Sequence, residues 1–185
     1  MKNLLENWNK FTIDESVLGN DYESKLEYEN GKVVLYHVST TEDISILDPI
    51  FASKNLKIYS KGEYRAWDRP RVFFFTKLGQ KDSSIGRIQG KGYKALIDPD
   101  KLYPVMKDPK RYSYPDRKKE YLEIRLKRDG KATYYPVNTY EMVATLSALD
   151  GYQGFMYNQH NGDLIVAMWV KVPVEKLNNI FYQEK

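Results

Sequence analysis

Five short runs of β-branched and aromatic residues, separated by turns that contain glycine or proline, constrain the fold of this chain most strongly. Such runs are typical of β-strands, because branched and aromatic side chains pack well on a pleated surface. With two helical patterns, the expected order is strand, loop, strand, strand, helix, helix, strand, strand. This order lacks the regular alternation of doubly wound folds and predicts an α+β domain with a strand-rich core. The expected strands cover residues 32–38, 71–76, 93–97, 155–157 and 164–172, and residues 102–105 continue the sheet.

Two segments show helical patterns. Residues 116–127 are highly charged and predict an exposed helix, anchored by Tyr121, Ile124 and Leu122. A second helix is expected to begin at Asn138, which can cap it while Glu141 bonds back as in a capping box. Its apolar face comprises Met142, Val143, Leu146 and Leu149, and Gly151 ends it.

Composition excludes several classes of protein. A chain of 185 residues with 42% hydrophobic residues is expected to bury a core as one domain. No apolar run approaches the roughly 18 residues of a membrane helix, so no membrane partner is expected. The absence of cysteine and the presence of only two histidines argue against disulfides and zinc sites, so no metal site is predicted. The net charge of +4 permits an acidic or nucleic-acid partner without requiring one.

The N-terminal 30 residues differ from the rest of the chain. Residues 1–11 have Leu4, Leu5, Trp8 and Phe11 at helical spacing and lack the apolar core of a signal peptide. Residues 12–30 are acidic and polar, as in a linker. The expected organisation is therefore an N-terminal helix and linker in residues 1–30, followed by a domain in residues 31–185.

Asp163 and the two histidines are the candidates for chemistry. Asp163 opens a predicted strand directly after a glycine, a place where single-domain proteins often carry a site. His37 and Ser39 lie two apart on one strand, which is the ordinary strand period and does not indicate a nucleophile and base. His37 and His160 could form a pair of the kind found in metal-independent nucleases. Alternatively, His37 is a strand histidine held by a hydrogen bond.

Four segments, taken in order, resemble motifs of the ADP-ribosyltransferase superfamily. The match is closest to the branch found in phage and bacterial polyvalent and toxin proteins, and it covers about residues 33 to 177. The opening MKNLLENWNKF resembles the head-targeting leader of internal proteins of large tailed phages, and residues 13–15 resemble the cleavage site that follows it. The four segments are YHVS at residues 36–39, VFFFT at 72–76, GYQGF at 151–155 and GDLIV at 162–166.

The resemblance implies both a fold and an activity. The fold would be a split β-sheet core with peripheral helices. The activity would be transfer of ADP-ribose from NAD, as substrate, to a host protein or nucleic acid. A phage effector of this kind would be packaged in the virion and would act in the host cytoplasm.

The resemblance also assigns roles to individual residues. Asp163 would lie beside the nicotinamide ribose and stabilise the cation that develops there. His37 would hydrogen-bond the adenosine ribose, and the backbone of Val38 would bind the nicotinamide amide. Ser39, with Thr40 as an alternative, would contact the nicotinamide ribose, and Phe74 or Phe75 would stack on nicotinamide. Arg65 and Arg71 lie between the first two motifs and could meet the NAD diphosphate.

This chain departs from the family pattern at three positions. Val38 replaces a glycine, phenylalanine replaces a tyrosine on the second strand, and Asp163 replaces a longer glutamate. An inactive binding module on the same scaffold is therefore an alternative to the enzyme, and a nuclease using His37 and His160 is another. Residues 158–162 would face the acceptor, and Asn161 stands where arginine-directed members carry a second acid, which argues against arginine as acceptor.

Overall fold

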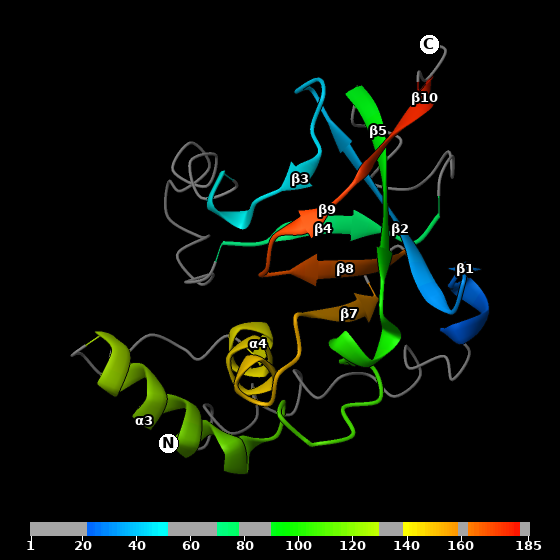
Figure 1. The fold of residues 1–185 in the computed structure, drawn as a ribbon. Helices are drawn as coiled ribbons and strands as arrows, with labels where there is room; N and C mark the ends of the chain where they lie inside the picture. The colour runs from blue at the N-terminus through cyan, green and yellow to red at the C-terminus, as the bar shows by residue number, and fades with distance from the viewer. Residues whose placement is uncertain (1–21, 52–69, 78–89, 130–138, 159–162, 182–185) are drawn as a thin grey trace.

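The computed structural model describes residues 22–51, 70–77, 90–129, 139–158 and 163–181 (Figure 1). The predicted N-terminal helix, the leader-like segment, Arg65 and His160 lie outside these ranges. Within them, the chain forms an α+β fold in which a large mixed sheet, a small second sheet and a few helices pack together. This confirms the strand-rich α+β class expected from the sequence.

A mixed sheet of eight strands is the centre of the described part of the chain. Its order is β10-β5-β2-β4-β8-β7-β6, with β1 paired to β2 outside this path, and β3 and β9 form a separate pair. Neighbouring strands are antiparallel except for β6 and β7, which are parallel. The strands are β1 (Tyr28–Glu29), β2 (Lys32–Ser39), β3 (Ile46–Leu47), β4 (Val72–Phe75), β5 (Gly90–Ile97), β6 (Leu102–Pro104), β7 (Gly154–Asn158), β8 (Leu164–Met168), β9 (Val172–Pro173) and β10 (Glu175–Phe181).

The large sheet is nearly divided between β2 and β4. On one side, β2 pairs with β5 along its whole length, from Val33↔Ile97 to Ser39↔Lys91. On the other side, the described register between β2 and β4 consists of the single pair Tyr36↔Phe75. The strands β10-β5-β2 and β4-β8-β7-β6 are therefore two ribbons joined at a narrow place.

Strand alternation divides the core into an apolar cluster on each face of the sheet. One cluster contains Leu35, Phe74 and Val166, and the β3–β9 pair covers it through Leu47 and Val172. The opposite face carries a cluster under the helices, which includes Tyr103, Tyr121, Met142, Val143, Phe155 and Ala167. On that face, Val38, Phe75 and Ile165 form a small third cluster at the narrow place between the two ribbons.

Both helices predicted within residues 31–185 are present. The short η6 (Pro115–Arg117) leads into α3 (Lys118–Asp129), in which Tyr121 is buried while Leu122 and Ile124 are half-buried. The second helix, α4 (Thr139–Leu149), buries most of its length against the sheet. Asn138, the expected cap, lies outside the described residues, and the Glu141 carboxylate is buried and forms an ion pair with Arg71.

Two segments that the sequence assigned to a linker and a turn belong to the sheet region. Tyr22 is buried in the core beside η2 (Glu23–Lys25), and β1 pairs with β2 across the expected boundary at residue 31. After Pro173, β10 pairs antiparallel with β5. Its sequence EKLNNIF carries two asparagines and one β-branched residue, so its strand signal was weak and pairing with β5 decides its conformation.

Gly154 lies close to the backbone of β8. A Cβ at this position would lie 2.7 Å from the Ala167 carbonyl oxygen and 2.4 Å from Met168 Sδ. Because the carbonyl is backbone, the two strands would have to separate. We expect Gly154→Ala to lower the free energy of unfolding by about 1–3 kcal/mol and Gly154→Val to lower it further. Urea denaturation of the two variants measures this, and equal stability of all three proteins would contradict it.

Candidate functional site

His37 occupies the opening between the two ribbons. Its Nδ1 lies 2.9 Å from the Phe73 carbonyl oxygen on β4, and its ring centroid lies 5.7 Å from that of Phe74. A carbonyl only accepts, so Nδ1 carries the proton and donates, and in the neutral ring Nε2 then presents a lone pair. The imidazole thus contacts β4 where the described backbone pairing of β2 and β4 has ended.

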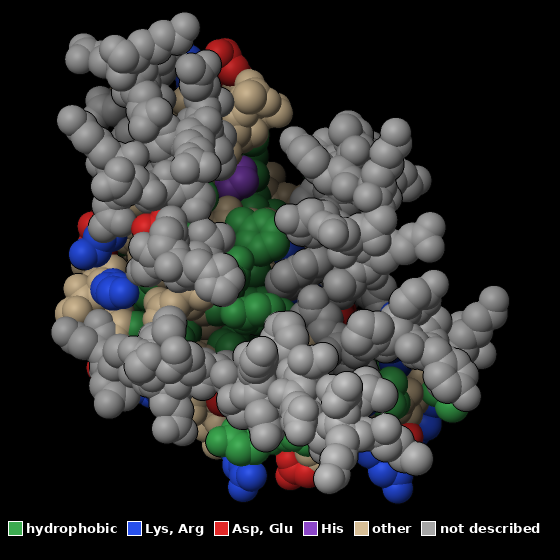
Figure 2. All heavy atoms as spheres, turned by 180° about the vertical axis from the view of Figure 1, so that it is seen from behind, with side chains coloured by type: hydrophobic (Ala, Val, Ile, Leu, Met, Phe, Trp, Pro, Cys, Tyr) green, Lys and Arg blue, Asp and Glu red, His purple; other side chains and the backbone are tan. Residues whose placement is uncertain are grey.

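Figure 2 shows how this opening reaches the surface. A histidine side chain is visible at the edge of a hollow, and hydrophobic side chains form the visible floor of that hollow. The histidine is His37, because His160 lies outside the described residues. On this face the histidine therefore lies beside hydrophobic side chains that are visible at the surface.

The protonation of His37 is coupled to folding. Burial lowers the pKa of His37, and the hydrogen bond to the Phe73 carbonyl offsets part of this effect. Below the ordinary histidine pKa of about 6.5, the unfolded chain therefore binds a proton more readily than the folded protein. Stability from this group is full above that pH and is lost as the pH falls toward the lowered folded pKa.

We accordingly expect the wild-type protein to lose stability between about pH 7.5 and pH 5, and His37→Gln to lose less over the same range. Glutamine can still donate to the Phe73 carbonyl but does not titrate, and His160 remains in both proteins as an internal control. Urea denaturation at a series of pH values measures the two slopes. Parallel stability curves for the two proteins would show that His37 is not the group responsible.

Residues 38–41, which follow His37, are held by internal contacts. The side chain of Val38 is buried with Phe75 and Ile165, and its backbone pairs with β5 opposite Gly92. Ser39 Oγ accepts a hydrogen bond from the Thr41 backbone nitrogen at 3.1 Å, and Thr40 is exposed. This hydrogen bond defines a turn, so the Ser39 hydroxyl stabilises the backbone in addition to any contact with a ligand.

Tyr93 fixes the same turn from the neighbouring strand. It lies opposite His37 in the β2–β5 register and is fully buried. Its hydroxyl donates to the Thr41 carbonyl at 2.8 Å and accepts from the Ile44 nitrogen at 3.4 Å. The backbone on which His37 and Ser39 stand is therefore tied to the core.

The three phenylalanines of β4 point to alternate faces. Phe74 is fully buried in the cluster that contains Leu35, whereas Phe75 belongs to the small cluster with Val38 on the opposite face. Phe73 is 39% exposed, and alternation places it on the same face as Phe75. Sequence reasoning chose between Phe74 and Phe75 and overlooked Phe73, although the strand period would have indicated that Phe73 and Phe75 share a face.

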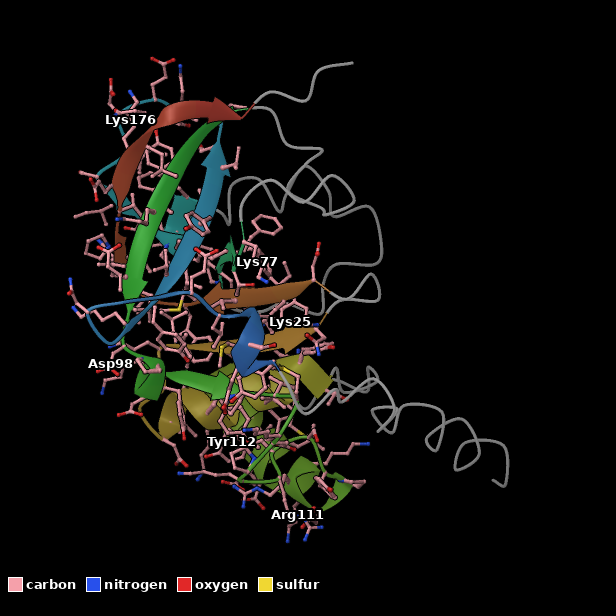
Figure 3. All side chains as sticks on the ribbon, turned by 90° about the vertical axis from the view of Figure 1, so that its right-hand side faces the viewer. Lys25, Lys77, Asp98, Arg111, Tyr112 and Lys176 are labelled. Carbon is pink, nitrogen blue, oxygen red and sulfur yellow. The ribbon has the colours of Figure 1, made fainter. Side chains whose placement is uncertain are left out.

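Asp163 is half-buried and stands directly before the first residue of β8. The end of β4 is tied to this point, because Thr76 Oγ1 donates to the Leu164 carbonyl at 3.3 Å. The pair Phe75↔Ile165 is the last register pair of β4 and β8 at this end. Extending that register by two residues places Lys77 opposite Asp163, and Figure 3 shows Lys77 at this end of β4.

His37 and Asp163 are not contact partners, and strand alternation puts His37 on the face of Phe74 and Asp163 on the face of Phe75 and Ile165. Tyr36, Phe75 and Ile165 form one row across β2, β4 and β8. His37 lies one residue to one side of this row and Asp163 two residues to the other, which separates them by ~10 Å along the strands and ~10 Å across them. A ligand that touches both must be extended and must reach from one face to the other through the opening, with about 14 Å between the two Cα positions that it bridges.

Arg71, which the sequence suggested as a partner of the NAD diphosphate, is buried and paired inside the protein. It is buried at 3% exposure, its Nη2 lies 2.5 Å from Glu141 Oε2, and its guanidinium lies 5.4 Å from the centre of the Phe155 ring. The charge of this arginine is therefore matched inside the protein, and it joins α4 to the start of β4. We do not include Arg71 among the residues that meet a ligand diphosphate.

The described residues contain no cluster of three or more histidine and carboxylate side chains that could hold a metal ion. Among these residues, no helix is long and apolar enough to cross a membrane. Comparisons of the chain with protein-family models, with curated proteins and with solved structures found no match.

Proposed function

We propose that this protein is an NAD-dependent mono-ADP-ribosyltransferase whose site is the opening between β2 and β4. The observation that carries the proposal is the near-division of the sheet at this place, with His37 in the opening and Asp163 at the start of β8. The four segments that resemble the superfamily form or immediately precede the strands β2, β4, β7 and β8. In the sheet these strands are neighbours in the order β2-β4-β8-β7, which supports the proposal.

The spacing of His37 and Asp163 suits a dinucleotide better than a small substrate. A ligand that bridges about 14 Å can place one ribose at the His37 ring and the other beside the Asp163 carboxylate. The neutral His37 ring offers Nε2 as an acceptor for a ribose hydroxyl. Of the phenylalanines on this face, Phe75 is the nearer to Asp163 and is the candidate for stacking on nicotinamide, because stacking requires a ring face and no hydroxyl.

The proposed reaction exchanges one bond for another at the nicotinamide ribose. The bond between ribose C1′ and the nicotinamide nitrogen breaks, and its electron pair leaves with neutral nicotinamide. An oxygen or nitrogen of the acceptor forms the new bond to C1′ and loses its proton to water. The Asp163 carboxylate stabilises the positive charge that develops on the ribose between these events, which is the step where a fixed charge has its greatest effect.

Two further parts of the proposal concern the acceptor and the delivery of the protein. The acceptor is a host macromolecule, and water is the slow default acceptor. The leader-like opening suggests delivery with a phage head into the host cytoplasm. Both parts rest on the sequence resemblance, since residues 1–21 and 159–162 lie outside the described ranges.

NAD turnover by the purified protein tests the proposal. The protein is incubated with NAD labelled on the adenylate part, with and without a bacterial lysate, and nicotinamide release and label transfer are measured. We expect both, with label transfer depending on lysate, and we expect His37→Phe to raise the KM for NAD because it removes the acceptor nitrogen while keeping a ring. A protein that neither cleaves NAD nor is stabilised by NAD would refute the proposal.

A binding module without turnover is the second candidate, and the shorter acid at position 163 favours it. Aspartate reaches about 1.5 Å less far than glutamate, and a displacement near 1 Å can lower a rate about 100-fold. For such a module, NAD or a related nucleotide would raise the melting temperature although no nicotinamide is released. The same incubation therefore separates the two candidates.

A further inference from the structure

The positive charge of this protein is concentrated in one segment. Residues 107–127, called the basic segment below, contain eight lysines and arginines and four aspartates and glutamates, a net charge of +4. The whole chain also carries +4, because the other 164 residues contain 21 basic and 21 acidic side chains. One carboxylate of the basic segment, Asp108, is buried, and two of its lysines, Lys107 and Lys110, pair with Glu23 and Asp150 outside the segment.

A buried carboxylate holds the loop at the start of the basic segment in one shape. Asp108 accepts hydrogen bonds from the Tyr112 nitrogen at 2.8 Å and the Ser113 nitrogen at 2.9 Å, and from the Tyr103 hydroxyl. The Arg111 nitrogen donates to the Asp108 carbonyl at 2.8 Å, and Arg111 has a φ of 56°. Such a backbone conformation is unusual for arginine and persists because the surrounding bonds determine it.

This loop presents a cation on an exposed aromatic ring. The Arg111 guanidinium lies 4.2 Å from the centre of the Tyr114 ring, and Tyr114 is 44% exposed. Lys119, on the first turn of α3, is exposed as well. Within the part of the chain that the structure describes, neither Arg111 nor Lys119 forms an ion pair. Figure 3 shows Arg111 at the end of the molecule opposite Lys176.

We propose that the basic segment binds single-stranded nucleic acid, with Arg111 and Lys119 on phosphates and Tyr114 stacked against a base. Lysine and arginine charges alone would suit any polyanion. The exposed tyrosine on a fixed loop favours a single strand, because unpaired bases offer ring faces for stacking and duplexes do not. This proposal is independent of the proposed NAD chemistry and concerns a different end of the molecule.

Fluorescence anisotropy tests the proposal with labelled 20-nucleotide oligo-dT and oligo-U at several NaCl concentrations, without NAD. We expect binding that weakens with salt, and a log K against log [NaCl] slope reduced by about 1.4 in Arg111→Gln/Lys119→Gln, since each lost phosphate contact on a single strand accounts for about 0.7. Tyr114→Ala should bind about tenfold more weakly, whereas Tyr114→Phe should bind as the wild type does.

The control is Lys171→Gln/Lys176→Gln, which removes two lysines outside the basic segment that pair with Asp48 and Asp43. This variant should keep the wild-type slope, and circular dichroism verifies that every variant is folded. The proposal is overturned if the wild type does not bind either oligonucleotide or if the control pair lowers the slope as much as the test pair. It is also overturned if polyglutamate or a DNA duplex competes as well as oligo-dT while Tyr114→Ala has no effect.

Discussion

Replacing Asp163 with asparagine is expected to slow NAD cleavage by at least about 100-fold, because a single fixed charge or donor at a developing charge commonly contributes that much. The amide has the same size as the carboxylate and lacks its charge. The loss should therefore appear in kcat, while the KM for NAD and the melting temperature stay near the wild-type values. Steady-state measurement of nicotinamide release gives kcat and KM, and thermal unfolding gives the melting temperature.

The control for this variant is a carboxylate of the same type at a remote position. Asp100→Asn removes an exposed aspartate on the short helix η5 (Pro99–Lys101) and should leave turnover unchanged. Asp163→Glu keeps the charge at a longer reach and should be more active than Asp163→Asn. If Asp163→Asn cleaves NAD at the wild-type rate, Asp163 is not the group beside the ribose, whatever the activity of the protein.

Breaking the buried Arg71–Glu141 pair is expected to cause the largest loss of stability. Either Arg71→Met or Glu141→Leu leaves one charge without its partner in a nearly water-free place, since both side chains are 1% exposed. Such a loss costs about 3–5 kcal/mol, which for a domain of this size lowers the melting temperature by ~6–20 °C. Urea and thermal denaturation of each single variant measure the effect.

The double variant Arg71→Met/Glu141→Leu distinguishes charge from packing. Two apolar side chains of similar length satisfy each other in the interior, so most of the stability lost in the single variants should return. If the double variant is as unstable as the sum of the singles, the two residues act independently. In that case, the contact of Arg71 with the Phe155 ring would account for the stability lost in Arg71→Met.

Much of the secondary structure followed from local patterns. The run KVVLYHVS is rich in branched and aromatic side chains, and β2 covers it from Lys32 to Ser39. The charged segment before Gly130 and the apolar face before Gly151 became α3 and α4 for the reasons that periodicity and stop signals provide. These features are local, so each could be derived from a dozen neighbouring residues.

Local sequence patterns predicted the candidate site only in part. The sequence singled out His37 and Asp163 as residue types in suggestive places, and these positions stay in the proposal. It did not distinguish Phe74, which is buried on one face, from Phe73 and Phe75 on the other. It also treated Arg71 as a candidate for a ligand, because an arginine beside an aromatic run does not reveal that Glu141, 70 residues later in the chain, will be its partner.

The sequence by itself determined the α+β class, the principal strands and helices, and the concentration of charge in the basic segment, because all of these depend on residues close together in the chain. Tertiary structure alone decided that β2 and β4 pair at one described position, that His37 contacts a carbonyl of β4 there, and that β10 joins β5. These outcomes depend on backbone hydrogen bonds between segments tens of residues apart. Such bonds have no local signature, since every residue except proline carries the same donor and acceptor.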